Sequence, residues 1–269
     1  MGARTRLSPR HKGSVPDSVP YRLKVRPGAL LALLVMLLPA FTAATPQQGV
    51  IAPGIQIRSV EDGWTCTGNF LFESRVNASL YLGIADHCLN KSDVGDPVLI
   101  GQDGATGRVA YSARRVMQAR GEELVANDFG LIEIDKPFRG WATASVLYYG
   151  GPTSLAACSS LRDGDRILVY GSSPWHLRLD ALQRMEGYAH LLAPPYNFDI
   201  LMRTPAVWGD SGAPALTADG RAIGVVVALS ATNLAVCLDR VFEYARTAGG
   251  LDIQLLTAAQ RNAGSLPDF

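Results

Sequence analysis

Short apolar runs, separated by glycine, proline and polar turn residues, recur along the chain from about residue 55 onward. Some alternate apolar and polar positions, as half-buried strands do, and others are short and wholly apolar, as buried strands are. The predicted strands of the first half are residues 55–58, 65–72, 80–84, 97–100, 107–111 and 129–134. Those of the second half are residues 166–171, 177–179 with 183–186, 198–202, 222–229 and 234–238. The series predicts an all-β fold, with enough strands in the first half for one small barrel.

A helical pattern follows the last predicted strand. Asp239 can cap a helix over residues 239–247, which has apolar residues at 241, 242, 244 and 245 and is followed by two glycines. For residues 251–269 we expect one or two further helical turns and a frayed end.

The first 44 residues have the order of an export signal. Residues 1–28 hold seven Lys or Arg and one acid, residues 29–38 are wholly apolar, and small residues stand at Thr42 and Ala44. This order predicts a basic leader and a secretory signal over residues 1–44, cleaved near Ala44. A retained membrane anchor and a start codon placed too early remain open. The expected destination is outside the cell or in its envelope, with membrane contact only through this segment.

Composition narrows the partners. The 269 residues carry 48% hydrophobic and 18% charged side chains, which describes a globular protein. A net charge of +1 gives no support to a nucleic-acid partner. The four cysteines are an even number, which agrees with an oxidising compartment.

The sequence Gly-Asp-Ser-Gly at residues 209–212 is the strongest candidate for chemistry. It lies between the predicted strand at 198–204 and the apolar run at 222–229. Glycines on both sides of Ser211 would let the backbone turn tightly, so that the amides of Gly209 and Ser211 could point at one spot beside the hydroxyl. That arrangement forms an oxyanion hole around a nucleophile. A polar turn without function is the alternative.

A base and an acid precede this serine. His87 follows the run at 80–84, and Asp128 stands at the head of the run at 129–134. Their order, His then Asp then Ser, is that of one known arrangement of the catalytic triad. Four residues compete for these roles: His176 and His190 as the base, and Asp96 and Asp135 as the acid.

These motifs resemble those of the chymotrypsin-fold (trypsin-like) serine proteases, of the compact bacterial secreted type. Ala-Asp-His-Cys at 85–88, Asn-Asp-Phe-Gly-Leu at 127–131 and Gly-Asp-Ser-Gly-Ala-Pro at 209–214 each match a family motif. The resemblance spans about residues 55–250. It implies two packed six-stranded antiparallel β-barrels and a short C-terminal helix. The first barrel would be residues 45–148, carrying His87 and Asp128, and the second residues 149–269, carrying Ser211.

The resemblance also implies a function. The chain would be a monomeric serine endopeptidase that acts on protein or peptide substrates through an acyl-enzyme, without a metal or organic cofactor. A disulfide between Cys66 and Cys88 is implied as well. Cys158 and Cys237 are left to pair with each other, or to remain as buried thiols. An esterase with the same triad, and an inactive protease-like binding module, remain open.

The family's substrate pocket falls on six residues of this chain: Pro205, Ala206, Trp208, Val226, Val227 and Ala228. Because no acid stands at 205–208, a preference for Lys or Arg before the scissile bond is disfavoured, and a small or apolar residue is expected. Trp208 could face this pocket or pack between the barrels.

Three departures from the family pattern bear on activity. Ala213 replaces a glycine, and its methyl group would narrow the cleft if it faced the substrate. Asp86 stands beside the base, where it could raise the pKa of His87 or face solvent. Asp210 needs a partner other than a newly cut N-terminus, and we expect an arginine or backbone amides.

Overall fold

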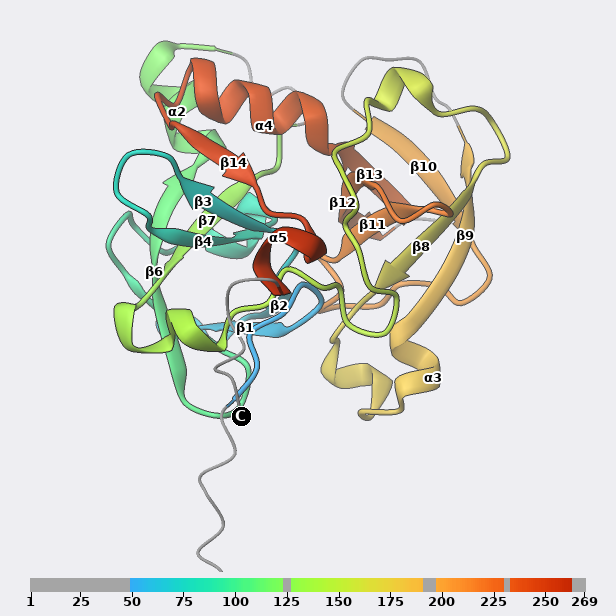
Figure 1. Ribbon diagram of the computed structural model, residues 1–269, viewed down its shortest axis with the longest axis horizontal. Coiled ribbons are helices and arrows are strands. Elements are labelled where there is room, and N and C mark those ends of the chain that lie inside the picture. The colour runs from blue at the N-terminus through green and yellow to red at the C-terminus, as the bar shows by residue number, and fades with distance from the viewer. Residues whose placement is uncertain (1–48, 123–126, 191–196, 230–232, 263–269) are drawn as a thin grey trace, which may run out of the picture. The chain divides into compact units, whose positions relative to one another are not determined.

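The computed structural model describes residues 49–122, 127–190, 197–229 and 233–262 (Figure 1). The predicted leader and signal at 1–44 lie outside the described residues. Within the described ranges, no helix has the length and apolar character needed to cross a membrane.

Seven strands of the first half of the chain and one strand from its C-terminal part form an antiparallel sheet of eight strands. Its strands are β1 (Gln56–Ser59), β2 (Thr65–Thr67), β3 (Leu71–Ser74), β4 (Leu80–Ile84), β5 (Pro97–Ile100), β6 (Ala105–Ser112), β7 (Gly130–Ile134) and β14 (Ile253–Leu255). They are ordered β14-β3-β4-β7-β6-β5-β1-β2. The predicted all-β fold is confirmed, and the six strands expected here are corrected to a sheet of eight, of which seven lie in the first half of the chain.

Two features account for the additional strands. The predicted strand at 65–72 divides, because Cys66 pairs with Ile57 of β1 whereas Leu71 pairs with Leu82 of β4. The chain end also returns to this sheet as β14, which pairs with β3, and Figure 1 shows the two strands side by side. Residues 253–255 therefore extend the first sheet, although they lie in the range that the sequence assigned to the second barrel.

The second half forms the predicted six-stranded closed barrel. Its strands are β8 (Arg166–Tyr170), β9 (Arg184–His190), β10 (Asn197–Met202), β11 (Pro214–Thr217), β12 (Ala222–Leu229) and β13 (Asn233–Cys237), in the order β10-β13-β12-β11-β8-β9. The predicted C-terminal helix is α4 (Leu238–Thr247). Its apolar face packs against the first sheet, where Phe242 stacks on Phe72 at 5.4 Å between ring centroids.

Short helices complete the described chain. They are η1 (Asp86–Leu89), α2 (Ala113–Arg120), η2 (Lys136–Trp141), η3 (Cys158–Ser160), η4 (Pro174–His176), α3 (Asp180–Gln183) and α5 (Ala258–Asn262), those labelled η being 3₁₀ helices. Two disulfides join elements of the fold. Cys66 of β2 is bonded to Cys88 of η1, and Cys158 of η3 is bonded to Cys237 at the end of β13.

Candidate active site

His87 and Asp128 lie at one edge of the first sheet. Strands β4 and β7 are paired there, with Ile84 opposite Gly130, so the segment after β4, which carries His87, lies beside the segment before β7, which carries Asp128. Asp128 Oδ2 lies 2.6 Å from His87 Nδ1, and Asp128 Oδ1 accepts a hydrogen bond of 2.7 Å from the backbone N–H of His87. The carboxylate thus holds both the ring and the backbone of the histidine, and it favours the tautomer with the proton on Nδ1.

The electrostatics around His87 favour its protonated form. Burial lowers the pKa of His87, but the hydrogen bond and charge of Asp128, with the charge of Asp86, outweigh burial and raise that pKa above its ordinary value. Asp86 itself faces inward, with only 2% of its surface exposed. It accepts a 2.8 Å hydrogen bond from the Arg114 amide at the start of α2, and burial raises the pKa of its carboxyl. Of the two possibilities for Asp86, the structure supports an electrostatic effect on His87.

Ser211 lies in the turn before β11, directly against the segment that carries His87. The Thr67 amide donates a 2.8 Å hydrogen bond to the Ser211 carbonyl. Gly212 has a φ of +92°, and a side chain there would clash with the Thr67 carbonyl and lie 3.2 Å from the Ala85 amide. Only glycine fits this approach, which brings the candidate nucleophile next to Thr67, one residue after Cys66, and to Ala85, three residues before Cys88.

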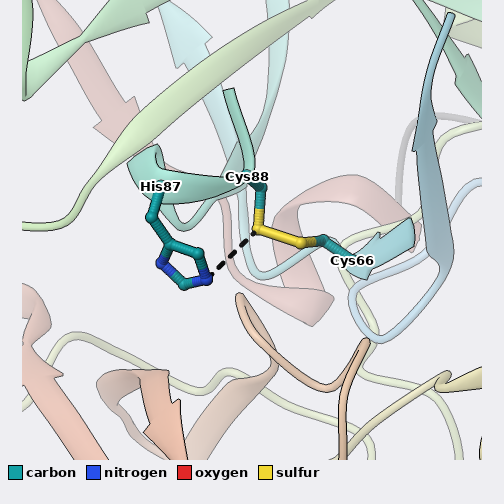
Figure 2. Close-up of side chains that lie close together, drawn as sticks. All are labelled: Cys66, His87 and Cys88. Carbon is teal, nitrogen blue, oxygen red and sulfur yellow. Dashed lines mark hydrogen bonds between the residues drawn. A yellow bond between two sulfur atoms is a disulfide. The ribbon is translucent and has the colours of Figure 1, made fainter. Parts of the chain in front are cut away.

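The second ring nitrogen of His87, Nε2, is on the disulfide side of the ring. Figure 2 shows His87 beside the Cys66–Cys88 bridge, with Nε2 at 3.9 Å from Cys88 Sγ. Among the described residues no hydrogen bond joins Nε2 to the Ser211 hydroxyl. Such bonds are often long in the absence of substrate and shorten when it binds.

The turn from Val207 to Ser211 is held by hydrogen bonds that leave two of its backbone amides without a protein acceptor among the described residues. Gly209 has a φ of +102°, and its carbonyl accepts a 2.8 Å hydrogen bond from the Thr67 hydroxyl. The Asp210 amide turns back to the Val207 carbonyl at 3.0 Å. The amides of Gly209 and Ser211 donate to no described residue, so both predicted oxyanion donors are unoccupied by protein groups.

Asp210 is completely buried beneath this turn and has three hydrogen-bond donors. The Val207 amide at 2.8 Å and the Ser173 amide at 3.2 Å are the backbone donors that the sequence led us to expect. The third is His176 Nε2, at 2.8 Å, in place of the expected arginine. His176 is therefore not a rival base. His190, the other rival, is half exposed and pairs with Asp163 at 3.0 Å.

Solved serine proteases superpose on most of the chain. Thermobifida fusca Protease A matches with a TM-score of 0.54 and 18% identity, over 78% of this chain and 100% of its own. Nocardiopsis protease matches with a TM-score of 0.53 and 16% identity, over 77% and 99%. A glutamic-acid-specific serine protease, described as using a histidine triad in substrate binding, matches with a TM-score of 0.53 and 16% identity, over 76% of this chain and 100% of its own. This chain has the chymotrypsin-like serine protease fold.

Neither a protein-family model nor a curated protein matches the sequence. At these identities the likeness establishes the chymotrypsin-like fold alone. What the chain does must therefore be argued from its own side chains.

The residues assigned to the substrate pocket differ in exposure. Pro205 and Trp208 are exposed, whereas Ala206, Val226 and Val227 are buried, and the Ala228 side chain lies outside the described atoms. Val226 supports the nucleophile turn, because its carbonyl accepts a 2.6 Å hydrogen bond from the Gly212 amide. The Ala213 methyl group is fully buried in the barrel core and does not narrow the cleft.

Within the part of the chain that the structure describes, two groups of side chains have the spacing of metal ligands: Cys66, His87 and Cys88, and Cys158, Cys237 and Asp239. In both groups the cysteines are joined in disulfides. A disulfide sulfur has no thiolate to offer, so neither group has the donors that a metal ion of this kind requires.

Proposed function

We propose that the chain is a serine endopeptidase that cleaves peptide bonds through an acyl-enzyme. The observation that carries the proposal is the two-point hold of Asp128 on His87 beside the Ser211 turn, whose Gly209 and Ser211 amides are free. A chain that had kept this fold only for binding would not need a positioned base or two unoccupied amide donors.

The proposed mechanism assigns one role to each side chain. Ser211 Oγ attacks the carbonyl carbon, and its proton passes to His87 Nε2. Asp128 keeps the imidazole oriented and stabilises its charged form. The amides of Gly209 and Ser211 stabilise the negative oxygen, each worth about 3 kcal/mol in measured cases. His87 then gives the proton to the leaving amine, and water releases the acyl group by the same steps in reverse.

Three further elements of the proposal concern context. We infer that the segment at 1–44 directs export. Two observations support this: basic, then apolar, then small residues follow one another along the segment, and the rest of the chain has two disulfides. We infer a small or apolar residue before the scissile bond, because positions 205–208 hold no acid. We infer two domains, residues 45–148 and residues 149–269. Strand β14 of the second range pairs with β3 of the first.

The experiment compares peptide and ester hydrolysis. Wild type and Ser211→Ala are incubated with unfolded casein and with a matched ester and anilide of one acyl group. An endopeptidase cuts casein internally and hydrolyses both small substrates, and Ser211→Ala does neither. Ester hydrolysis without cleavage of casein or anilide would instead favour an esterase, and a folded wild type inactive on all three would favour a binding module.

A further inference from the structure

Three of the chain's four tryptophans surround one groove beside the turn from Val207 to Ser211, which holds the proposed oxyanion donors. Trp64, Trp175 and Trp208 are 50%, 71% and 66% exposed. With Asp62, Thr65, Pro174 and Gly209 they line a groove of about 310 Å³. Exposed aromatic side chains gathered at one place mark a binding surface, because a folded chain otherwise buries such large apolar groups.

The groove is assembled from both halves of the fold. Trp64 belongs to the loop between β1 and β2, Trp175 to η4 after β8, and Trp208 to the turn that leads to Ser211. The rings of Trp64 and Trp208 are 6.0 Å apart between centroids, so the two halves meet here through aromatic contact. Gly209, whose amide is a proposed oxyanion donor, forms part of the wall. A side chain in the groove would therefore belong to a residue near the reacting carbonyl.

Whether the groove receives residues before or after the scissile bond can be inferred from the half of the fold that forms its walls. The pocket expected for the residue before that bond is built from the second barrel alone. The groove has a wall from the β1–β2 loop and the start of β2, residues 62–65, which continues into Cys66 and its bridge to Cys88 beside His87. His87 is the group that protonates the leaving amine, so the groove lies on the departing side of the substrate.

The charge of the groove selects the kind of side chain. Asp62 is the one ionisable residue in its lining. Its Oδ1 accepts a 3.2 Å hydrogen bond from the Trp64 amide, and it forms no ion pair with any described residue. A carboxylate beside three indole rings fits a cation, since ring faces attract positive charge and arginine in particular stacks on them.

We propose that this groove binds an arginine or lysine side chain at one of the first two positions after the scissile bond. The proposal rests on the proposed endopeptidase function. It is compatible with a small or apolar residue before the bond, because the two pockets are separate. Trp64, Trp175 and Trp208 provide the stacking surfaces, and Asp62 provides the charge.

Binding can be measured without catalysis, because most of the indole fluorescence comes from the groove itself. The Ser211→Ala variant is titrated with the amidated tripeptides Ala-Arg-Ala, Ala-Leu-Ala and Ala-Glu-Ala. The Arg peptide should give a saturable change in fluorescence, and Asp62→Asn in the same background should weaken it about fivefold. Glu61→Gln, the exposed neighbouring acid outside the groove, should leave it unchanged. Equal binding of the Leu peptide, or no saturable change with any peptide, would overturn the proposal.

Cleavage provides the second measurement. Internally quenched peptides that differ only by Arg or Leu at the two positions after the bond should show kcat/KM about fivefold higher for Arg. Asp62→Asn should abolish that difference by lowering kcat/KM for the Arg peptides toward the value for the Leu peptides. Equal cleavage of all peptides would contradict cation binding by the groove but would still agree with the proposed endopeptidase function. Binding of the Arg peptide by a chain that cleaves nothing supports a cation site and contradicts the proposed enzyme.

Discussion

His176 Nε2 lies 2.8 Å from Asp210 Oδ2, and the two side chains are 4% and 0% exposed. The histidine comes from η4, and this segment also lies directly against the turn from Val207 to Ser211. A side chain on Gly209 would lie 3.1 Å from Pro174 and 3.2 Å from the Ser173 backbone. The η4 segment therefore holds both the acid beneath the turn and the glycine within it.

His176→Ala should reduce kcat more than it raises KM. The substitution leaves a buried carboxylate with one donor fewer, which costs about 3 kcal/mol of stability. It also frees the turn that positions the Gly209 amide, which should lower kcat at least about tenfold. The measurement is kcat and KM with denaturant unfolding. The control is His190→Ala, which removes a half-exposed histidine–aspartate pair and should change neither the kinetic constants nor the stability. A His176→Ala variant as active and as stable as wild type would contradict the role of His176 in holding the turn.

The activity should rise with pH through a pKa above that of an ordinary histidine. Ser211 needs His87 in its neutral form, and the surroundings raise the pKa of His87. The raised value means that the charged pair with Asp128 stabilises the fold at low pH and that this contribution is lost as pH rises through the raised pKa. The pH profile of kcat/KM, which reports the free enzyme, measures this pKa.

Asp86→Asn should move the acidic limb of that profile to lower pH. The charge of Asp86 is one of the effects that raise the pKa of His87, and asparagine keeps the shape without the charge. Asp103→Asn, in an exposed turn, is the matched control and should leave the limb in place. If Asp86→Asn leaves the limb unmoved, Asp86 acts as a structural partner of the Arg114 amide and guanidinium and not on His87.

Thr67→Val should lower both stability and kcat. The Thr67 hydroxyl donates to the Gly209 carbonyl at 2.8 Å and accepts from the Ser172 amide at 2.9 Å, in a buried position. Valine has the same shape but leaves both backbone groups without that partner, at a cost of about 1–3 kcal/mol. Thr67→Ser should restore both properties in unfolding and kinetic assays. Loss in serine and valine alike would point to packing of the methyl group.

Loss of either disulfide should lower stability, but only loss of the Cys66–Cys88 bridge should also lower kcat. Replacing Cys66 and Cys88 by alanine opens a loop with a sequence separation of 22 and should cost about 3 kcal/mol. It should also lower kcat of the folded fraction, because this bridge joins β2 to the residue after His87. Replacing Cys158 and Cys237 should cost at least as much stability but leave kcat of the folded fraction unchanged. Calorimetry with active-site titration distinguishes the two effects.

The all-β fold could be predicted from local patterns in the sequence. The two-barrel arrangement was implied by the resemblance of three short motifs to a family, and the roles of the site residues stay predictions. Strands appear as short apolar runs, and the motifs around His87, Asp128 and Ser211 each extend over a few adjacent residues. The partner of Asp210 could not be predicted in this way. His176 is 34 residues away, and its approach depends on how η4 turns; two consecutive residues in left-handed conformation, Leu177 and Arg178, follow it.

The missed elements depend on tertiary contacts. Strand β14 is three residues long, and a helix was expected there, because only its pairing with β3 makes it a strand. Helix α2 buries only Ala113 and Met117, so its sequence has little apolar periodicity. Trp208 could face a pocket or pack between barrels, and its contact with Trp64 of the other half could not be read from either local sequence.

Covalent labelling tests the central claim most directly. The folded, disulfide-bonded chain from residue 45 is treated with a fluorophosphonate, and adduct formation is followed by intact mass and peptide mapping. A single adduct at Ser211 is predicted, absent from Ser211→Ala and much slower in His87→Ala. A folded wild type that forms no adduct at Ser211, or labels equally fast without His87, would contradict an assembled catalytic triad.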